Sequence, residues 1–419
     1  MNYKNYILAF ILLQLSPFIS AQSTWTVQSS GITTNLLCVR CVDNTVAWEA
    51  GDSGVVIRTS DGGANWDSVG GGNLGTNIIW NIDALNENVA FVTFTNSTTY
   101  MYRTTNGGVD WQPVFTQSGG FINDMHMYNN SNGIAYGDPV GGKWTVIRTT
   151  DGGATWNRIP TEPTPNGNEI GIYYNSLCVT DTSHIWFLGS QRVYRTSDGG
   201  LTWLSTATPD YYLSVWFLND SVGMTSSAFD AGLSTDSGIT WNSISIPTGD
   251  YYTLAGSGFR DFWFPEGPYV YHTIDFGATW SSELVLTSWG QLWATDFVTM
   301  GNNAIGYVAG SGGSIARYEG LITSVNSTPP KLSGYYLEQN YPNPFNPVTT
   351  IKYSVPRTSH IILAVLGALG REIRTLVDEE KYPGTYTVKF DGSDLSSGVY
   401  FCVMKADNFI ETRKLILLK

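Results

Sequence analysis

Short, largely apolar stretches recur along most of the chain. Each stretch ends at a glycine, as in the segments 46–51, 133–137, 184–189 and 304–310. Short apolar runs with β-branched and aromatic residues are typical of β-strands, and the flanking glycines favour tight turns. We therefore predict an all-β protein built from many short strands.

A second repeat follows most of these stretches. Its copies share a threonine or serine, an aspartate or asparagine, a glycine and a closing tryptophan, and they lie at 58–66, 103–111, 148–156, 195–203, 234–241 and 273–280. Successive closing tryptophans are 38 to 47 residues apart. This is the period of a four-stranded β-propeller blade, so the repeat predicts a propeller.

The acidic or amide residue of each copy is expected to stabilise a hairpin turn. Its side-chain oxygen can accept hydrogen bonds from backbone N–H groups of the turn, while glycine supplies a positive φ and tryptophan packs into a seam between strands. These turns are structural and carry no reaction. The six capping residues are Asp61, Asn106, Asp151, Asp198, Asp236 and Asp275.

The two ends of the repeat region predict how the ring closes. Segment 304–310 is followed by a strand at 314–318 but by no further copy of the turn, whereas residues 24–27 resemble the strand that follows such a turn. If the N-terminal strand completes the last blade, the ring has no exposed sheet edge. We expect seven blades, with six as the alternative if the last blade is degenerate.

Three further segments surround the propeller region, which spans 22–320. Residues 1–21 combine Lys4, an apolar run and a closing Ala21, the pattern of a secretory signal peptide. Residues 321–334 are rich in Ser, Thr and Pro and predict a linker. Residues 335–419 contain several strand-like runs, and we expect a small immunoglobulin-like β-sandwich there.

The repeated turn resembles the Asp box, also called the bacterial neuraminidase repeat. The whole of 22–320 is similar to the photosystem II assembly and stability factor family of Asp-box propellers, through these boxes and through the segment 137–143, Gly-Asp-Pro-Val-Gly-Gly-Lys. This resemblance implies a protein-binding or assembly scaffold without an enzymatic reaction.

The last 85 residues resemble the type A C-terminal sorting domain of the type IX secretion system. The resemblance rests on the segments 341–347, 369–372 and 395–401 and on the closing Lys419, while Leu366-Gly367 departs from the family pattern. It implies contact with the type IX machinery and passage through the periplasm, which leaves the protein secreted or on the outer cell surface. An ordinary immunoglobulin-like module that stays in place is the alternative.

Charge and composition narrow the possible partners. The chain has 22 Lys and Arg against 35 Asp and Glu, a formal net charge of −13, which disfavours nucleic acids and anionic membranes. No segment after the signal peptide approaches the ~20 apolar residues that a membrane-spanning helix needs. We expect a monomer that binds a protein partner or a polysaccharide.

The cysteines and histidines do not predict a metal or a cofactor. Cys38 and Cys41 lie three residues apart in a predicted strand, so their side chains should point to opposite faces. Cys178 and Cys402 are expected in the core. The four histidines, at 126, 184, 272 and 360, show no ligand spacing.

Candidate binding residues are the tryptophans outside the boxes. Trp80, Trp144, Trp263 and Trp293 could contact a protein or a sugar ring if they lie on loops around the central funnel; packing between blades is the alternative. Glu49, Asp138, Asp261 and Glu266 lie near loops that could reach the channel mouth, as solvated carboxylates or as an acid–base pair.

A sialidase-like glycosidase is the remaining alternative. It would need three arginines that converge on the substrate carboxylate. Arg158 lies in an Arg-Ile-Pro segment but follows a box, on a predicted outer strand. The arginines at 58, 103, 148 and 195 recur at one position in successive blades, which favours a role in the scaffold. We therefore expect no catalytic residues.

Overall fold

The computed structural model describes residues 24–321, apart from 173–174, 209–211, 228–229, 248–252, 258–260, 287–289 and 302, and residues 335–418, apart from 341, 356–358, 368–369, 382–383 and 407–408. The predicted signal peptide, 1–21, and nearly all of the predicted linker lie outside these residues. Strands dominate the described part, which confirms the all-β class. Its helical turns are the short η1 (Asp52–Gly54), η2 (Gly72–Leu74) and η3 (Ser311–Gly313).

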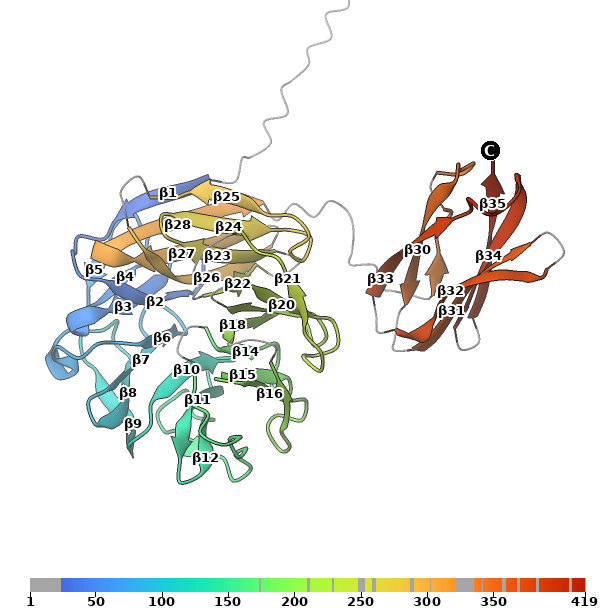
Figure 1. Cartoon of the computed structure of the whole chain (residues 1–419). Helices are drawn as coiled ribbons and strands as arrows, with labels where there is room; N and C mark the ends of the chain where they lie inside the picture. The colour runs from blue at the N-terminus through green and yellow to red at the C-terminus, as the bar shows by residue number, and fades with distance from the viewer. Residues whose placement is uncertain are drawn as a thin grey trace, which may run out of the picture.

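The described residues of 24–321 form seven four-stranded antiparallel sheets, which Figure 1 shows arranged around a common centre. We call each sheet a blade and number the blades in chain order. Blade 1 contains β2 (Leu36–Cys41), β3 (Ala47–Gly51), β4 (Val56–Thr59) and β5 (Asp67–Ser68); blade 2 contains β6 (Asn81–Ala84), β7 (Ala90–Thr95), β8 (Thr98–Thr104) and β9 (Gln112–Ser118); blade 3 contains β10 (Ile122–Met127), β11 (Gly133–Val140), β12 (Lys143–Thr149) and β13 (Asn157–Arg158).

The next blades repeat the same strand order. Blade 4 contains β14 (Leu177–Val179), β15 (Ile185–Gly189), β16 (Arg192–Thr196) and β17 (Leu204–Ala207); blade 5 contains β18 (Tyr212–Phe217), β19 (Gly223–Ser227), β20 (Ala231–Ser234) and β21 (Asn242–Ile244); blade 6 contains β22 (Ala255–Gly256), β23 (Phe262–Glu266), β24 (Tyr269–Thr273) and β25 (Ser281–Leu284). The first strand of each blade faces the centre of the ring (Figure 1).

Blade 7 is assembled from both ends of the propeller region. It contains β26 (Leu292–Met300), β27 (Asn303–Gly310), β28 (Ser314–Leu321) and β1 (Thr24–Ser29). Strand β1 pairs antiparallel with β28 over its whole length, from Thr24 opposite Glu319 to Ser29 opposite Ser314. The N-terminal strand therefore closes the ring as the sequence predicts, and the outer edge of β28 is paired.

The hydrophobic core of the propeller lies between neighbouring blades. On β3, Trp48 and Ala50 pack with residues of blade 2, whereas Ala47 packs with Ile305 and Tyr307 of blade 7. Because successive side chains of a strand point to opposite faces, each blade supplies one face to each neighbour. This arrangement explains why the strands are apolar at both odd and even positions.

The C-terminal residues form two sheets over one shared core. One sheet contains β29 (Tyr336–Leu337), β30 (Val348–Val355) and β33 (Gly384–Asp391), and the other contains β31 (Ser359–Gly367), β32 (Glu372–Lys381), β34 (Gly398–Ala406) and β35 (Phe409–Leu417). Apolar side chains from both sheets meet in a single cluster that includes Ile351, Phe390, Leu363 and Met404. This core belongs to the tail alone.

Candidate functional site

The Asp boxes form rigid turns after the third strand of their blades. In the first box, Asp61 Oδ1 accepts the backbone N–H of Asn65 and the hydroxyl of Thr59, each at 2.9 Å. Thr59 Oγ1 in turn accepts the N–H of Gly63 at 2.8 Å, and Gly63 has a φ of 83°. The hydrogen bonds of this carboxylate lie within the turn, so the turn itself accounts for the presence of Asp61.

The other boxes repeat this pattern. Asn106 accepts a backbone N–H through its side-chain oxygen at 3.0 Å, as Asp151 does, and Asp198, Asp236 and Asp275 do so at 2.8 to 2.9 Å. Hydrogen bonds from Thr155 and Thr149 lower the pKa of Asp151 to about 2, which keeps this carboxylate ionised. The sequence shows the shared threonine or serine, but sequence reasoning missed that its hydroxyl accepts a glycine N–H of the turn.

Two arginines on the third strands of their blades, Arg58 and Arg317, join neighbouring blades. Arg58 of blade 1 donates to the carbonyls of Glu87 and Gly107 in blade 2, at 2.7 and 3.3 Å. Arg317 of blade 7 donates to the carbonyl of Asn44 in blade 1 at 3.3 Å, across the closure of the ring. Arg158 lies on the outer strand of blade 3, and its Nε donates to Glu162 Oε1 at 2.7 Å. None of these three arginines lines the central cavity, the space that the first strands of the blades enclose.

The four candidate tryptophans lie in four different blades. Trp144 on β12 and Trp263 on β23 are 0% and 1% exposed and lie in cores between blades. This corrects their assignment as binding residues, because a fully buried indole has no surface to offer a ligand. Trp80, just before β6, and Trp293, on β26, are half-buried. Trp80 packs edge-to-face against Phe121, with ring centroids 5.8 Å apart.

The candidate carboxylates also lie apart from one another. Glu49 is fully buried on β3, where burial raises its pKa well above the ordinary value. Asp138 accepts the N–H of Gly171, and Asp261 accepts the hydroxyl of Ser257, each at 2.8 Å. Glu266 ends β23. None of the four lines the central cavity, so the structure does not place them at the channel as expected.

The first strands of six blades enclose a cavity of about 220 Å³ at the centre of the propeller. Its charged and polar lining comes from β2, β6, β10 and β26 and from the segments before and after β14; these residues are Arg40, Asp83, Asp124, His126, Asn175, Thr180 and Asp296. Blade 5 contributes Trp216 and Phe217. We regard this central cavity as the candidate functional site.

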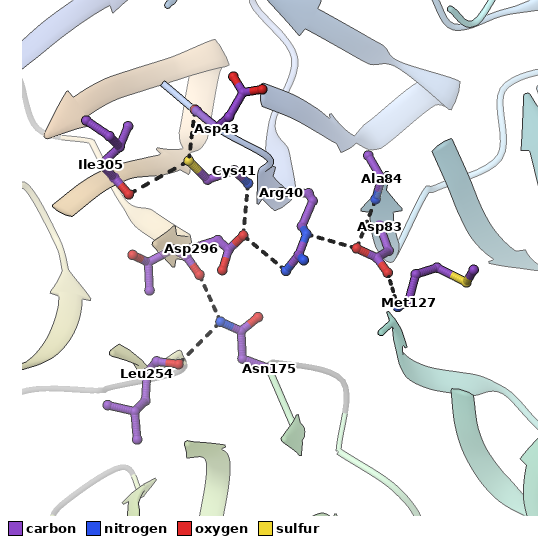
Figure 2. A network of polar contacts seen from close by, with 11 residues as sticks. Arg40, Cys41, Asp43, Asp83, Ala84, Met127, Asn175, Leu254, Asp296 and Ile305 are labelled. Carbon is purple, nitrogen blue, oxygen red and sulfur yellow. Dashed lines mark hydrogen bonds and ion pairs between the residues drawn. The ribbon is translucent and has the colours of Figure 1, made fainter. Parts of the chain in front are cut away.

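Arg40 is the hub of the polar network in Figure 2. Its Nε lies 2.9 Å from Asp83 Oδ1, and its Nη1 lies 3.5 Å from Asp296 Oδ2. The same aspartates also accept backbone N–H groups of adjacent blades, Asp83 from Met127 at 2.6 Å and Asp296 from Cys41 at 2.9 Å. The network therefore joins blades 7, 1, 2 and 3, and both carboxylates have partners.

Asp124 differs from these two carboxylates. It accepts the N–H groups of Met125 at 2.7 Å and Leu177 at 3.0 Å, but no ion pair to a described residue is found for it. Burial raises its pKa to about 7. Burial and the nearby Arg40 charge lower the pKa of His126 to about 4, so this imidazole is neutral at physiological pH.

The cavity is consequently acidic when Asp124 is ionised. Among the described residues that line it, Arg40 supplies one positive charge against three aspartates. Such a site attracts a cationic group, since opposite charges interact more strongly where water is partly excluded. Sequence reasoning missed these residues, although polar side chains inside short apolar strands, such as Asp83 in Asn-Ile-Asp-Ala, were a usable signal.

Comparison with solved structures supports the propeller fold. The structure "YCF48 bound to D1 peptide" is similar with a TM-score of 0.57 and 16% identity, over 70% of this chain and 96% of that one. YCF48 from Cyanidioschyzon merolae is similar with a TM-score of 0.55 and 16% identity, over 70% of this chain and 98% of that one. The WD40 propeller domain of Doa1 is similar with a TM-score of 0.51 and 11% identity, over 70% of this chain and 96% of that one.

Sequence comparison identifies the tail. No curated protein matches the chain, and in the described ranges we find no helix with the length and apolar character to cross a membrane. Residues 339–418 match the family of the secretion system C-terminal sorting domain. The chain is thus a propeller that carries a type IX sorting domain, which directs it to the cell surface or the medium.

Proposed function

We propose that the exported propeller is a non-enzymatic scaffold that binds a protein partner through the central cavity. The observation that carries this proposal is the charge of the cavity, where Arg40 is outnumbered by Asp83, Asp124 and Asp296. A lysine or arginine side chain of a partner segment would compensate that charge. One propeller of the same fold was solved with a bound peptide, which is in keeping with this mode of binding.

The hydrogen bonding of the acidic groups favours binding over hydrolysis. Asp83 and Asp296 are held by Arg40 and by backbone N–H groups, and the box aspartates are saturated within their turns. A sialidase needs three arginines that grip one carboxylate, whereas Arg40 is the single arginine among the described residues of the cavity lining.

A pull-down with the mature chain, residues 22–419, tests the proposal. At pH 8, where Asp124 with its pKa of about 7 is ionised, the Asp124→Asn variant should reduce recovery of the partner about tenfold, because it removes a partly buried charge while keeping a side-chain oxygen for the backbone donors. Asp61→Asn is the matched control, because asparagine already occupies the same box position at Asn106. Equal recovery by both variants contradicts a role for the cavity, and retention of polysaccharide without protein favours carbohydrate binding.

We further propose that residues 335–419 engage the type IX machinery during export. Deletion of these residues should leave the propeller in the periplasm, since the signal peptide alone directs passage across the inner membrane. Immunoblots of periplasm, surface and medium measure the distribution. Normal amounts of the truncated protein at the surface would show that export does not depend on the tail.

A further inference from the structure

The turns between the first and second strands of blades 1 to 5 share one construction. An aspartate or asparagine side chain accepts two backbone N–H groups, two and three residues ahead, and closes the turn. The residues in this position are Asp43, Asn86, Asn129, Asp181 and Asn219. These repeated turns allow one blade to be compared with the others.

The turn of blade 4 carries an imidazole three residues after its capping residue. His184 follows Asp181 by three residues, where the corresponding turns of blades 1, 2 and 5 have Val46, Val89 and Val222. Asp220 lies in the turn of blade 5 and faces His184 across the seam between the blades. The turn itself does not require an imidazole, since valine serves in three other blades.

Three potential metal-binding atoms converge at this seam. His184 Nδ1 lies 2.9 Å from Asp181 Oδ2 and 3.5 Å from Asp220 Oδ1, and one donor atom from each residue lies within 4.8 Å of the others. A ring nitrogen can donate its single proton to one acceptor, yet two carboxylates face Nδ1. A cation that replaces this proton would satisfy both carboxylates.

The three side chains are held in place by other contacts. Asp181 Oδ1 accepts the N–H groups of Ser183 and His184, at 2.6 and 2.9 Å, so its Oδ2 points to the imidazole. Asp220 Oδ1 accepts the hydroxyl of Thr180 at 3.0 Å. The side chains of Asp181, His184 and Asp220 are 48%, 28% and 54% exposed, which leaves room for water ligands.

We propose that Asp181, His184 and Asp220 bind one divalent metal ion of the zinc class and so tie blade 4 to blade 5. Zinc binds imidazole nitrogen and carboxylate oxygen at ~2.0–2.2 Å. Two ligands at ~2.1 Å from an ion are ~3.0 Å apart at a right angle and ~3.4 Å apart at a tetrahedral angle, close to the observed 2.9 and 3.5 Å. Binding through Nδ1 displaces the proton from that nitrogen and leaves a neutral imidazole with its proton on Nε2, and water completes the coordination.

The imidazole distinguishes this ion from calcium. Ca²⁺ prefers roughly six to eight oxygen ligands. Zn²⁺ and the neighbouring transition metals bind imidazole nitrogen well. We therefore expect Zn²⁺ to bind with at least tenfold higher affinity than Ca²⁺.

Isothermal titration of the metal-free mature chain with Zn²⁺ tests the site. The wild type should bind one ion, and His184→Val and Asp220→Asn should each weaken binding at least tenfold. Both replacements occur naturally at equivalent turn positions, as Val222 and Asn44, so both variants should fold. Tryptophan fluorescence checks this, because all 15 tryptophans precede residue 321.

The control is His360→Ala, which removes an exposed histidine of the tail that faces Asp378 at 3.3 Å. It should leave Zn²⁺ binding unchanged. The proposal is overturned if the wild type does not bind Zn²⁺, if both folded seam variants bind as the wild type does, if Ca²⁺ binds equally well, or if the His360 variant is the one that loses the ion.

Discussion

Replacing Arg40 with methionine removes the cation that neutralises two aspartates at the centre of the propeller. The side chains of Asp83 and Asp296 are 2% and 9% exposed, and Arg40 is 26% exposed. Methionine keeps much of the length of the arginine side chain without its charge. The variant therefore leaves two buried carboxylates without a counter-ion while it disturbs packing little.

The expected loss of stability follows from this burial. Breaking a buried ion pair by removing one partner costs ~3–5 kcal/mol. Both carboxylates retain backbone donors, Met127 N–H for Asp83 and Cys41 N–H for Asp296, so we take the lower end and expect a loss of ~3 kcal/mol. An exposed pair would lose only ~0–1 kcal/mol.

The loss should also depend on pH. Burial raises the pKa of Asp296 and Arg40 counteracts this, so without Arg40 the pKa of the folded-state carboxyl rises further. A group whose pKa is higher in the folded than in the unfolded state favours folding as the pH falls. The difference in stability between wild type and variant should therefore shrink from pH 8 to pH 5.

Urea unfolding followed by tryptophan fluorescence measures this effect in the propeller alone, because the tail contains no tryptophan. The triple variant Arg40→Met, Asp83→Asn, Asp296→Asn should regain at least half of the lost stability, since it removes the unpaired charges. A loss below ~1 kcal/mol, the value of an exposed pair, or a triple variant no more stable than the single one would refute the reasoning.

Three further predictions concern the stability of the propeller. Asp61→Ala should lower the midpoint of urea unfolding, because it removes the acceptor of the Asn65 N–H and the Thr59 hydroxyl, whereas Asp61→Asn should change the midpoint little because Asn106 serves in the next box. Trp25→Ala should cost ~3 kcal/mol and accelerate unfolding in stopped-flow, because Trp25 fixes the closing strand against Tyr318, with ring centroids 5.3 Å apart; unchanged kinetics would contradict this. Because the folded-state pKa of Asp124 is about 7 against an ordinary 3.8, stability should decline as pH rises from 4 to 7, and Asp124→Asn should flatten that decline.

The sequence predicts those features that repeat along the chain. Six blades repeat their strands and box within about forty residues, so local pattern reveals these blades, and the unmatched N-terminal strand reveals the closure. Burial within a blade is harder to predict, because an alternating strand can bury both faces. Trp144 and Trp263 therefore look like possible loop residues in the sequence but lie in the core.

The central cavity and the candidate metal site depend on contacts between blades. Arg40 meets Asp296, 256 residues later in the chain, and no local pattern pairs them. His184 lies far in sequence from the other histidines, and its potential partner Asp220 belongs to the next blade. The spacing of histidines along the chain therefore showed no ligand set, although the fold brings three donor atoms together.

Photo-crosslinking from within the cavity tests the central claim most directly. A photoreactive amino acid replaces His126, which lines the cavity, or Val109, which is 78% exposed in a box, in the full-length protein at the cell surface. We predict that position 126 crosslinks one protein through a segment that contains lysine or arginine, and that position 109 does not. Crosslinks to that protein from position 109 alone, or none from position 126, would contradict binding in the cavity.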